Sequence, residues 1–97
     1  MNIESLRELG LTEGEIKVYL ALISLGENTS GPIVDESGVS ISKVYTILDR
    51  LARKGLVSHI VKRKTKYFKA ADPNRLLTFL LEKEQNLRAQ EENLKKL

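Results

Sequence analysis

Apolar side chains recur every three to four positions through most of this chain, which is the spacing of helices that bury one face. The first such segment extends from Asn2, a residue suited to capping a helix, to Leu9, and Gly10 follows as a left-handed stop. The second begins at Thr12, where Thr-Glu-Gly-Glu matches a capping box, and ends at Gly26. Its predicted inward stripe consists of Ile16, Tyr19, Leu20, Ile23 and Leu25.

Two further helices are predicted on either side of a tight turn. A short helix spans about residues 31–37 and stops at Gly38, and after Val39 a longer helix spans about residues 40–54 and stops at Gly55. The predicted inward residues are Ile33 and Val34 in the short helix and Ile41, Val44, Ile47, Leu48 and Leu51 in the long one. Two helices joined by a glycine-containing turn form a helix-turn-helix.

The pattern changes after the fourth helix. The run LVSHIV is rich in branched residues, KRKT follows as a tip, and KYFKAA returns, which predicts a β-hairpin whose turn lacks the Asn-Gly signature. Asp72 as a cap and Pro73 in the first turn then open a helix that continues to Leu97. We therefore predict a mainly α fold with a small β-hairpin (α+β), divided into residues 1–71 and a C-terminal helix of residues 72–97.

Leucines recur along this last helix at a spacing of seven residues, which is typical of a coiled coil. A long helix with one apolar stripe is rarely stable alone in water, so we expect dimerisation through this stripe. The alternative is that the leucines pack against the first helix of the same chain. The predicted dimerisation residues are Leu76, Leu80, Leu87, Leu94 and Leu97, with Lys83 and Gln90 interrupting the heptad.

Charge is distributed unevenly along the chain, although the net charge is only +3. Residues 1–39 carry two basic and seven acidic side chains, a net charge of −5. Residues 40–70 carry nine basic side chains and a single acidic one, Asp49, a net charge of +8. Residues 71–97 carry five of each. Such a basic segment predicts a surface that binds a polyanion, the alternative being a merely solvated basic face.

The candidate chemistry is that of binding and not of catalysis. The chain has no cysteine, a single histidine (His59), no Gly-rich phosphate loop and no pair of carboxylates against an apolar cleft, so we expect no enzyme, no metal site and no cofactor. The first residues lack the features of a signal peptide, and no apolar run approaches the roughly 20 residues that span a bilayer. We therefore expect a cytoplasmic, nucleoid-associated protein that does not contact a membrane.

A helix-turn-helix places its second helix in the major groove of DNA, where its first residues meet the base edges. Short polar side chains at the start of residues 40–54, and arginines further along, fit that position. The hairpin adds a wing, about residues 61–67, whose basic tip suits phosphate neutralisation or an adjacent minor groove. The side chains expected to contact double-stranded DNA are Thr29, Ser30, Ser40, Ser42, Lys43, Tyr45, Thr46, Arg50, Arg53, Lys62, Arg63, Lys64, Thr65 and Lys66.

Some of these side chains have a second interpretation. Tyr45 stands at the edge of the apolar stripe, so core packing and DNA contact fit it equally well. Thr29 and Ser30 are suited to capping a helix, whose free amides also bind phosphate. Phe68 is expected to pack in the hairpin, whereas Tyr67 could either pack there or stack on a base.

At this point the sequence resembles a known family. The segments LTEGEIKVYLALISLG, SGPIVDESGVSISKVYTILDRLARKGLV and KYFKAADP are similar to the winged helix-turn-helix of TrmB-like transcription regulators, which are mainly archaeal. The resemblance covers about residues 6–80 and implies that residues 40–54 read DNA, that the hairpin is the wing and that the last helix forms a dimerising coiled coil. Many members carry a C-terminal effector or sugar-binding domain, which implies that this chain is either a minimal regulator or a fragment of a longer one.

Three functions fit these features. The one we favour is sequence-specific binding of double-stranded DNA by a homodimeric transcription regulator. Non-specific binding of a chromatin type is an alternative, because phosphate contacts dominate the affinity in both cases. A winged helix that binds a protein in an assembly factor is the other, although it would have little use for a basic wing tip. The sequence specifies no small-molecule effector.

Overall fold

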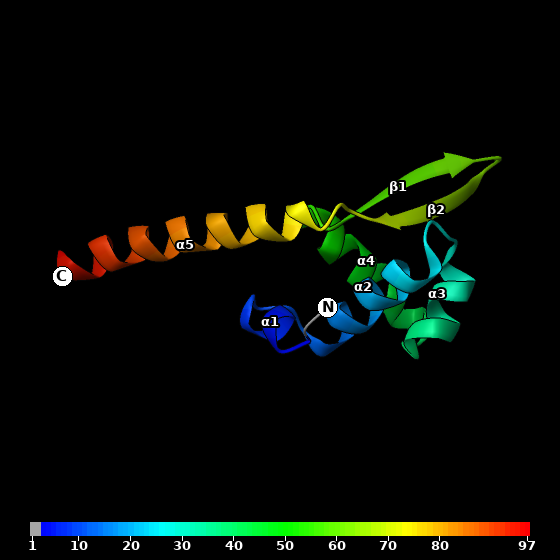
Figure 1. The fold of residues 1–97 in the computed structure, drawn as a ribbon, viewed down its shortest axis with the longest axis horizontal. Coiled ribbons are helices and arrows are strands. Elements are labelled where there is room, and N and C mark those ends of the chain that lie inside the picture. Colours follow the sequence, from blue (N-terminus) through cyan, green and yellow to red (C-terminus); the bar gives the residue numbers. More distant parts are fainter. Residues whose placement is uncertain (1–2) are drawn as a thin grey trace.

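A computed structural model describes residues 3–97. Within this range the elements are α1 (Ile3–Glu8), α2 (Glu13–Leu25), α3 (Ser30–Ser37), α4 (Ile41–Arg53), β1 (Val57–Lys62), β2 (Thr65–Ala70) and α5 (Asn74–Lys95), arranged as Figure 1 shows. The order confirms the prediction of a mainly helical fold with one small β-hairpin and a long C-terminal helix. The predicted cap at Asn2 lies outside the described residues.

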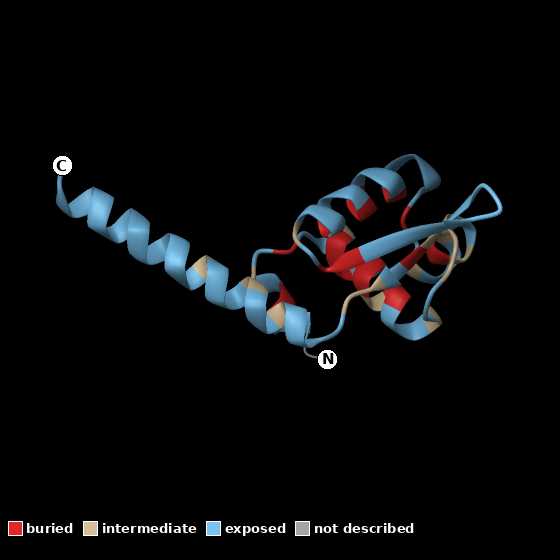
Figure 2. Cartoon of the chain, turned by 90° about the horizontal axis from the view of Figure 1, so that it is seen from above, coloured by how far each residue is buried: buried red, intermediate tan, exposed pale blue. Residues whose placement is uncertain are grey.

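The hydrophobic core lies where α2, α3 and α4 meet the base of the hairpin (Figure 2). Tyr19 is only 1% exposed, which confirms its predicted place in the core. The buried apolar residues of this cluster are Leu6, Leu11, Ile16, Val18, Tyr19, Leu22, Ile33, Val39, Val44, Ile47, Leu48, Leu51, Leu56, Val57 and Phe68. The core thus fixes the helix-turn-helix and the start of the wing as one unit.

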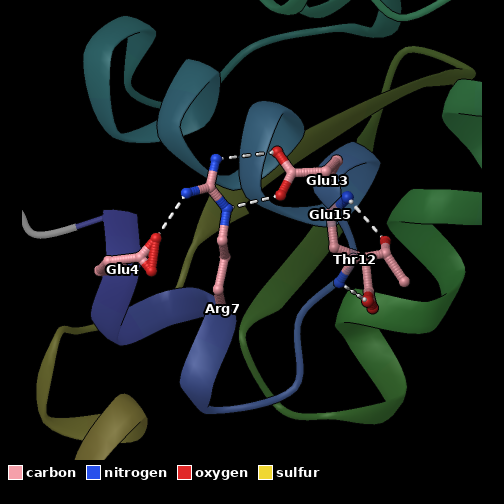
Figure 3. A network of polar contacts seen from close by, with 5 residues as sticks. All are labelled: Glu4, Arg7, Thr12, Glu13 and Glu15. Atoms are coloured by element: carbon pink, nitrogen blue, oxygen red, sulfur yellow. Dashed lines mark hydrogen bonds and ion pairs between the residues drawn. The ribbon is translucent and has the colours of Figure 1, made fainter.

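The ends of α2 follow from local chemistry that the sequence predicts correctly. The amide of Glu15 donates to Thr12 Oγ1 at 3.2 Å, and the amide of Thr12 donates to Glu15 Oε1 at 2.9 Å, which completes the capping box (Figure 3). Arg7 donates through Nε to Glu13 at 2.6 Å and through Nη1 to Glu4 at 2.7 Å, so a polar network joins α1 to the first turn of α2 (Figure 3).

The predicted glycine stops all have positive φ: 92° at Gly10, 76° at Gly26, 75° at Gly38 and 76° at Gly55.

Two residues predicted to face inward are on the surface. Ile23 is 44% exposed, because the inward face of α2 is centred on Val18 and Leu22, both of which the predicted stripe omitted. Ile41 is 55% exposed, because it is the first residue of α4 and lies at the edge of the buried stripe.

The hairpin and α5 extend from opposite sides of the helical core (Figure 1). The strands pair antiparallel, from Val57 opposite Ala70 to Lys62 opposite Thr65. Asp72 Oδ1 accepts a hydrogen bond from the amide of Asn74, the first residue of α5, at 2.8 Å, while Pro73 occupies the position directly before the helix. The molecule measures 53 × 26 × 25 Å, and α5 leads out along its long axis. Within residues 3–97, no helix is long and apolar enough to cross a membrane.

Candidate nucleic-acid interface

The polar face of α4 points outward because its apolar face is held in the core. Val44, Ile47, Leu48 and Leu51 are all buried. A polar contact fixes the far end of the helix as well, because Lys54 Nζ donates to Glu15 Oε2 at 2.6 Å and so joins α4 to the start of α2.

Glu15 remains ionised in this buried position. Burial by itself raises the pKa of its carboxyl group, but the hydrogen bonds from Lys54 and from the Thr12 amide outweigh burial, and the pKa lies below its usual range. The side chain is 1% exposed, whereas that of Lys54 is 28% exposed. The pair therefore fixes the orientation of α4 from inside the protein.

The outward face of α4 carries the polar residues predicted for it. Ser42, Lys43, Thr46, Arg50 and Arg53 are all exposed. Ser40 immediately precedes the helix, but its hydroxyl does not cap it; Ser40 Oγ and Ser42 Oγ lie 3.1 Å apart. Two hydroxyl groups therefore lie together at the start of α4, where a helix in the major groove meets base edges.

Tyr45 lies on the surface and joins three elements. It is 53% exposed, and its hydroxyl lies 2.8 Å from Ser30 Oγ at the start of α3. Its ring meets that of Phe68 on β2 edge to face, with 6.4 Å between the ring centroids. Tyr45 therefore packs against the edge of the core through Phe68, and half of the residue remains accessible to a ligand.

Thr29 or Ser30 is predicted to cap α3, and the structure confirms only the position of Thr29, not a capping hydrogen bond. Thr29 occupies the capping position, but its side chain makes no capping hydrogen bond. Its amide donates instead to Asn28 Oδ1 at 2.9 Å, and Ser30 is engaged by Tyr45. The hydroxyl of Thr29 thus lies at the start of α3 but makes no hydrogen bond to the amides of the helix.

The wing ends in a two-residue turn. Arg63 and Lys64 have φ of 50° and 67°, which is the left-handed backbone of a type I′ hairpin turn, usually formed by Asn-Gly. Two long basic side chains therefore occupy positions that favour small residues. Both are exposed at the tip of the hairpin, beyond the pair formed by Lys62 and Thr65.

The base of the wing is fastened to the loop between α2 and α3. The amide of Asn28 donates to the carbonyl of Phe68 at 2.9 Å, and the amide of Phe68 donates back at 2.7 Å. Lys62 Nζ donates to Glu27 Oε2 at 2.9 Å and lies 5.2 Å from the ring centroid of Tyr67. Phe68 is buried, which confirms its predicted packing, and Tyr67 is partly buried beside Lys62.

A hollow of about 170 Å³ separates α4 from the wing. Tyr45 and Asp49 line it from α4, and His59, Lys66 and Phe68 line it from the hairpin. Lys66 thus faces α4, whereas Arg63 and Lys64 end the wing. Residues 3–97 include no group of three potential metal ligands.

The basic segment is only partly neutralised within the chain. Of its nine basic side chains, three form ion pairs: Arg53 with Asp49, Lys54 with Glu15 and Lys62 with Glu27. The other six have no ion-pair partner among residues 3–97; they are Lys43, Arg50, Arg63, Lys64, Lys66 and Lys69. These six charges remain available to a polyanion.

The predicted dimerisation leucines divide into two groups along α5. Leu76 is partly buried, and together with Leu77 and Leu80 it faces Leu6 and Leu9 of α1 across an apolar hollow of about 560 Å³. Further along, the leucines are open to solvent: Leu87 is 68%, Leu94 65% and Leu97 98% exposed. Packing against the first helix of the same chain therefore accounts only for the start of the heptad.

Sequence reasoning missed the residues that fasten the wing and α4. Glu27 and Asn28 read as an ordinary turn after a helix, and Glu15 reads only as part of a capping box. Their partners Lys62, Phe68 and Lys54 are 35, 40 and 39 positions away, and no local pattern marks such pairs.

Comparison with known proteins agrees with this geometry. A family model described as the sugar-specific transcriptional regulator TrmB matches residues 6–74. The HTH-type sugar sensing transcriptional regulator TrmBL1 of Pyrococcus furiosus is 38% identical over 55 residues, which cover 57% of this chain and 16% of that protein. These matches confirm the resemblance seen in the sequence, over a small part of the relative's length.

Two solved structures share the fold. That of TrmBL2, described as an archaeal chromatin protein with a novel mode of DNA binding, matches 96% of this chain and 37% of its own with a TM-score of 0.85 and 26% identity. A possible transcriptional regulator from Methanosarcina mazei matches 99% of this chain and 88% of its own, with a TM-score of 0.77 and 13% identity. The second likeness concerns the fold alone. Together they confirm the winged-helix architecture.

Proposed function

The chain belongs to the TrmB family of DNA-binding transcriptional regulators, and we propose that it binds specific sites on double-stranded DNA as a homodimer. The observation that carries the proposal is the set of five unpaired basic side chains on α4 and the wing, namely Lys43, Arg50, Arg63, Lys64 and Lys66; Lys69, the sixth, lies beside the end of α2. A single binding surface on which both elements meet accounts for their position.

In this proposal α4 enters the major groove, which is about 12 Å wide and accepts one helix. The hydroxyls of Ser42 and Thr46 are short enough to approach base edges near the start of the helix. Lys43 and Arg50 flank that row on one side and reach the phosphates. The buried ion pair of Lys54 and Glu15 supports this arrangement, because it holds α4 at a fixed angle to the core.

The wing contacts the backbone or the adjacent minor groove through its tip. Arg63 and Lys64 project furthest, while Lys62, the last residue of β1, is held just before the turn by Glu27. A rigid base with a charged tip suits phosphate contacts, which position a protein on DNA without reading the sequence.

The dimer forms through α5. Its exposed leucines, from Leu80 to Leu94, supply an apolar stripe that a second copy would cover. Two-fold symmetry would then place the two copies of α4 about one DNA turn apart, roughly 34–36 Å, so that the preferred site is a palindrome. In this proposal residues 1–71 bind DNA, and residues 72–97 set the spacing between the two DNA-binding domains of the dimer.

A second function is favoured by one observation, the likeness to TrmBL2, which is described as a chromatin protein. Sequence-independent coating of DNA would use the same basic surface, because it depends on phosphate contacts alone.

Selection of bound sequences from a pool of random duplexes, at two salt concentrations, tests both functions. A site-specific regulator is expected to enrich a palindrome, and more strongly at the higher salt, where phosphate contacts weaken. Strong binding with no enriched sequence would assign the chromatin-type function instead. If the chain bound no duplex at the lower or at the higher salt concentration, both functions would be excluded.

A further inference from the structure

Asp49 is the one acidic residue within the basic segment of residues 40–70, and it lies on the outward face of α4. Its side chain is 59% exposed and borders the hollow between α4 and the wing. Ser42, Thr46 and Asp49 follow one another at spacings of four and three residues, so they form one stripe along the helix. The stripe is about 10 Å long, which lies within the width of the major groove.

Neither folding nor phosphate binding accounts for an acid at this position. Asp is a weak helix former, and a carboxylate shortly before the end of a helix is opposed by the helix dipole. Asp49 and Arg53 form an ion pair at 2.9 Å. Both side chains are exposed, so the pair contributes little to stability. A negative charge here also repels the phosphates that the surrounding cations attract.

The same carboxylate is well suited to one base. Cytosine presents its N4 amino group in the major groove as a donor. Adenine also presents a donor, N6, but its neighbouring N7 is an acceptor that repels a carboxylate, and guanine presents only acceptors there. Arg53 lies one turn further along, and its pairing with Asp49 orients the planar guanidinium group that recognises guanine O6 and N7.

We propose that Asp49 determines specificity by accepting a hydrogen bond from the N4 amino group of a cytosine in the major groove, with Arg53 held beside it as a positioned donor. This inference rests on the proposed DNA-binding function and adds to it the base that α4 selects. The negative charge of Asp49 within the basic surface thus serves to select between bases and does not increase the affinity for DNA.

The test compares the wild-type chain with Asp49→Ala and Asp49→Asn by selection from the random duplex pool. The selected duplex is then measured by fluorescence anisotropy with each base in turn at every position. The wild type is expected to prefer cytosine at one position in each half-site. Asp49→Ala is expected to reduce that preference at least about fivefold, and Asp49→Asn to shift it toward adenine, which an amide recognises through N6 and N7.

Glu92→Ala is the matched control, because it removes one exposed acid from α5, at a position off the leucine stripe. It is expected to leave every base preference unchanged. A cytosine preference that persists in Asp49→Ala would overturn the inference and leave the proposed function intact. So would an equal rise in affinity for all duplexes, since this would assign Asp49 to phosphate repulsion alone. A wild-type chain that binds no duplex would overturn the proposed function as well.

Discussion

At the scale of single residues, three polar contacts hold the proposed DNA-binding elements in place. Lys54 meets Glu15 across 39 positions of the chain, Lys62 meets Glu27 across 35, and Tyr45 meets Ser30 across 15. The first contact is partly buried, with Glu15 1% and Lys54 28% exposed, and the other two are at the surface. Removal of one partner is therefore expected to destabilise the protein most at the first contact.

Glu15→Gln is expected to lower the free energy of unfolding by about 1–3 kcal/mol at neutral pH, because it leaves the partly buried Lys54 without its charged partner. The pKa of Glu15 is lowered in the folded state, so its stabilisation is present above the pKa of the unfolded chain and is lost as the pH falls through the folded pKa. The difference between the two proteins should therefore shrink under acidic conditions. Urea unfolding at a series of pH values measures it.

Glu13→Gln is the matched control, because it removes a carboxylate from the same helical turn but from an exposed ion pair with Arg7. It is expected to change stability much less. An equal loss in both variants, or a loss for Glu15→Gln that does not depend on pH, would contradict the structural role assigned to the buried pair.

The residue scale is also where the sequence predicts least. The capping box of Thr12 with Glu15 was predictable because both partners are three positions apart and follow a known pattern. The contact of Glu15 with Lys54 was not, because it depends on how α2 and α4 cross. Tyr45 had two interpretations for the same reason: its position on the helix does not reveal whether a neighbouring element covers it.

At the scale of elements, the wing combines a fixed base with a strained tip. Asn28 pairs with Phe68 at the base, and the turn places Arg63 and Lys64 in the left-handed region. A non-glycine residue in that region is disfavoured by about 1–2 kcal/mol. The turn therefore has two charged residues at positions where folding alone favours Asn-Gly. This supports a role for the two charges in binding.

The double variant Arg63→Asn with Lys64→Gly separates the two effects. It is expected to raise the melting temperature slightly, because Asn-Gly is the preferred pair for this turn. It is also expected to reduce the slope of log affinity for duplex DNA against log salt by about two per protomer, one for each lost phosphate contact. Calorimetry and anisotropy titrations measure the two quantities on the same samples.

A matched control is Lys95→Gln with Lys96→Gln, which removes the same charge at the end of α5. Its salt slope should equal that of the wild type. If both double variants reduced the slope equally, the effect would come from net charge, and the assignment of the wing tip to phosphate contact would be wrong.

The sequence predicts the bounds of the helices and strands better than it predicts the contacts of single residues. Helix ends were marked by glycines, by the capping box and by Asp72, each acting through backbone groups within a few residues. The predicted bounds of the third and fourth helices agree with α3 and α4 to within one residue. The sequence places the hairpin tip at KRKT but does not fix the two turn residues, because Arg63-Lys64 does not belong to the residues that usually form such a turn.

At the scale of the whole molecule, α5 leads away from the core with most of its leucines uncovered (Figure 2). Leu87→Asp is expected to dissociate the proposed dimer, because it places a charge in the middle of the apolar stripe. Light scattering at tens of micromolar protein should then report a monomer, and affinity for a palindromic duplex should fall. Ala89→Asp, an exposed position off the stripe, is the control that should stay dimeric. A wild-type chain that is already monomeric would contradict the proposal.

Dimerisation could be predicted only from spacing, because a heptad indicates an apolar stripe but not what covers it. The structure places the beginning of the stripe, around Leu76, opposite α1 across an apolar hollow, and leaves Leu87 and Leu94 exposed. The DNA-binding surface was more predictable, since the net charge of +8 in residues 40–70 is a property of the sequence itself. Which charges stay unpaired depends on the fold.

The measurement that tests the central claim most directly is the affinity of the wild-type chain for a duplex as a function of salt. Each neutralised phosphate contributes about −0.9 to the slope of log affinity against log salt. If α4 and the wing bind DNA through the unpaired cations, the slope should be steeper than about −3. An affinity that does not change with salt, or no binding at roughly 50 mM salt, where phosphate contacts are strong, would contradict the assignment of this surface to DNA.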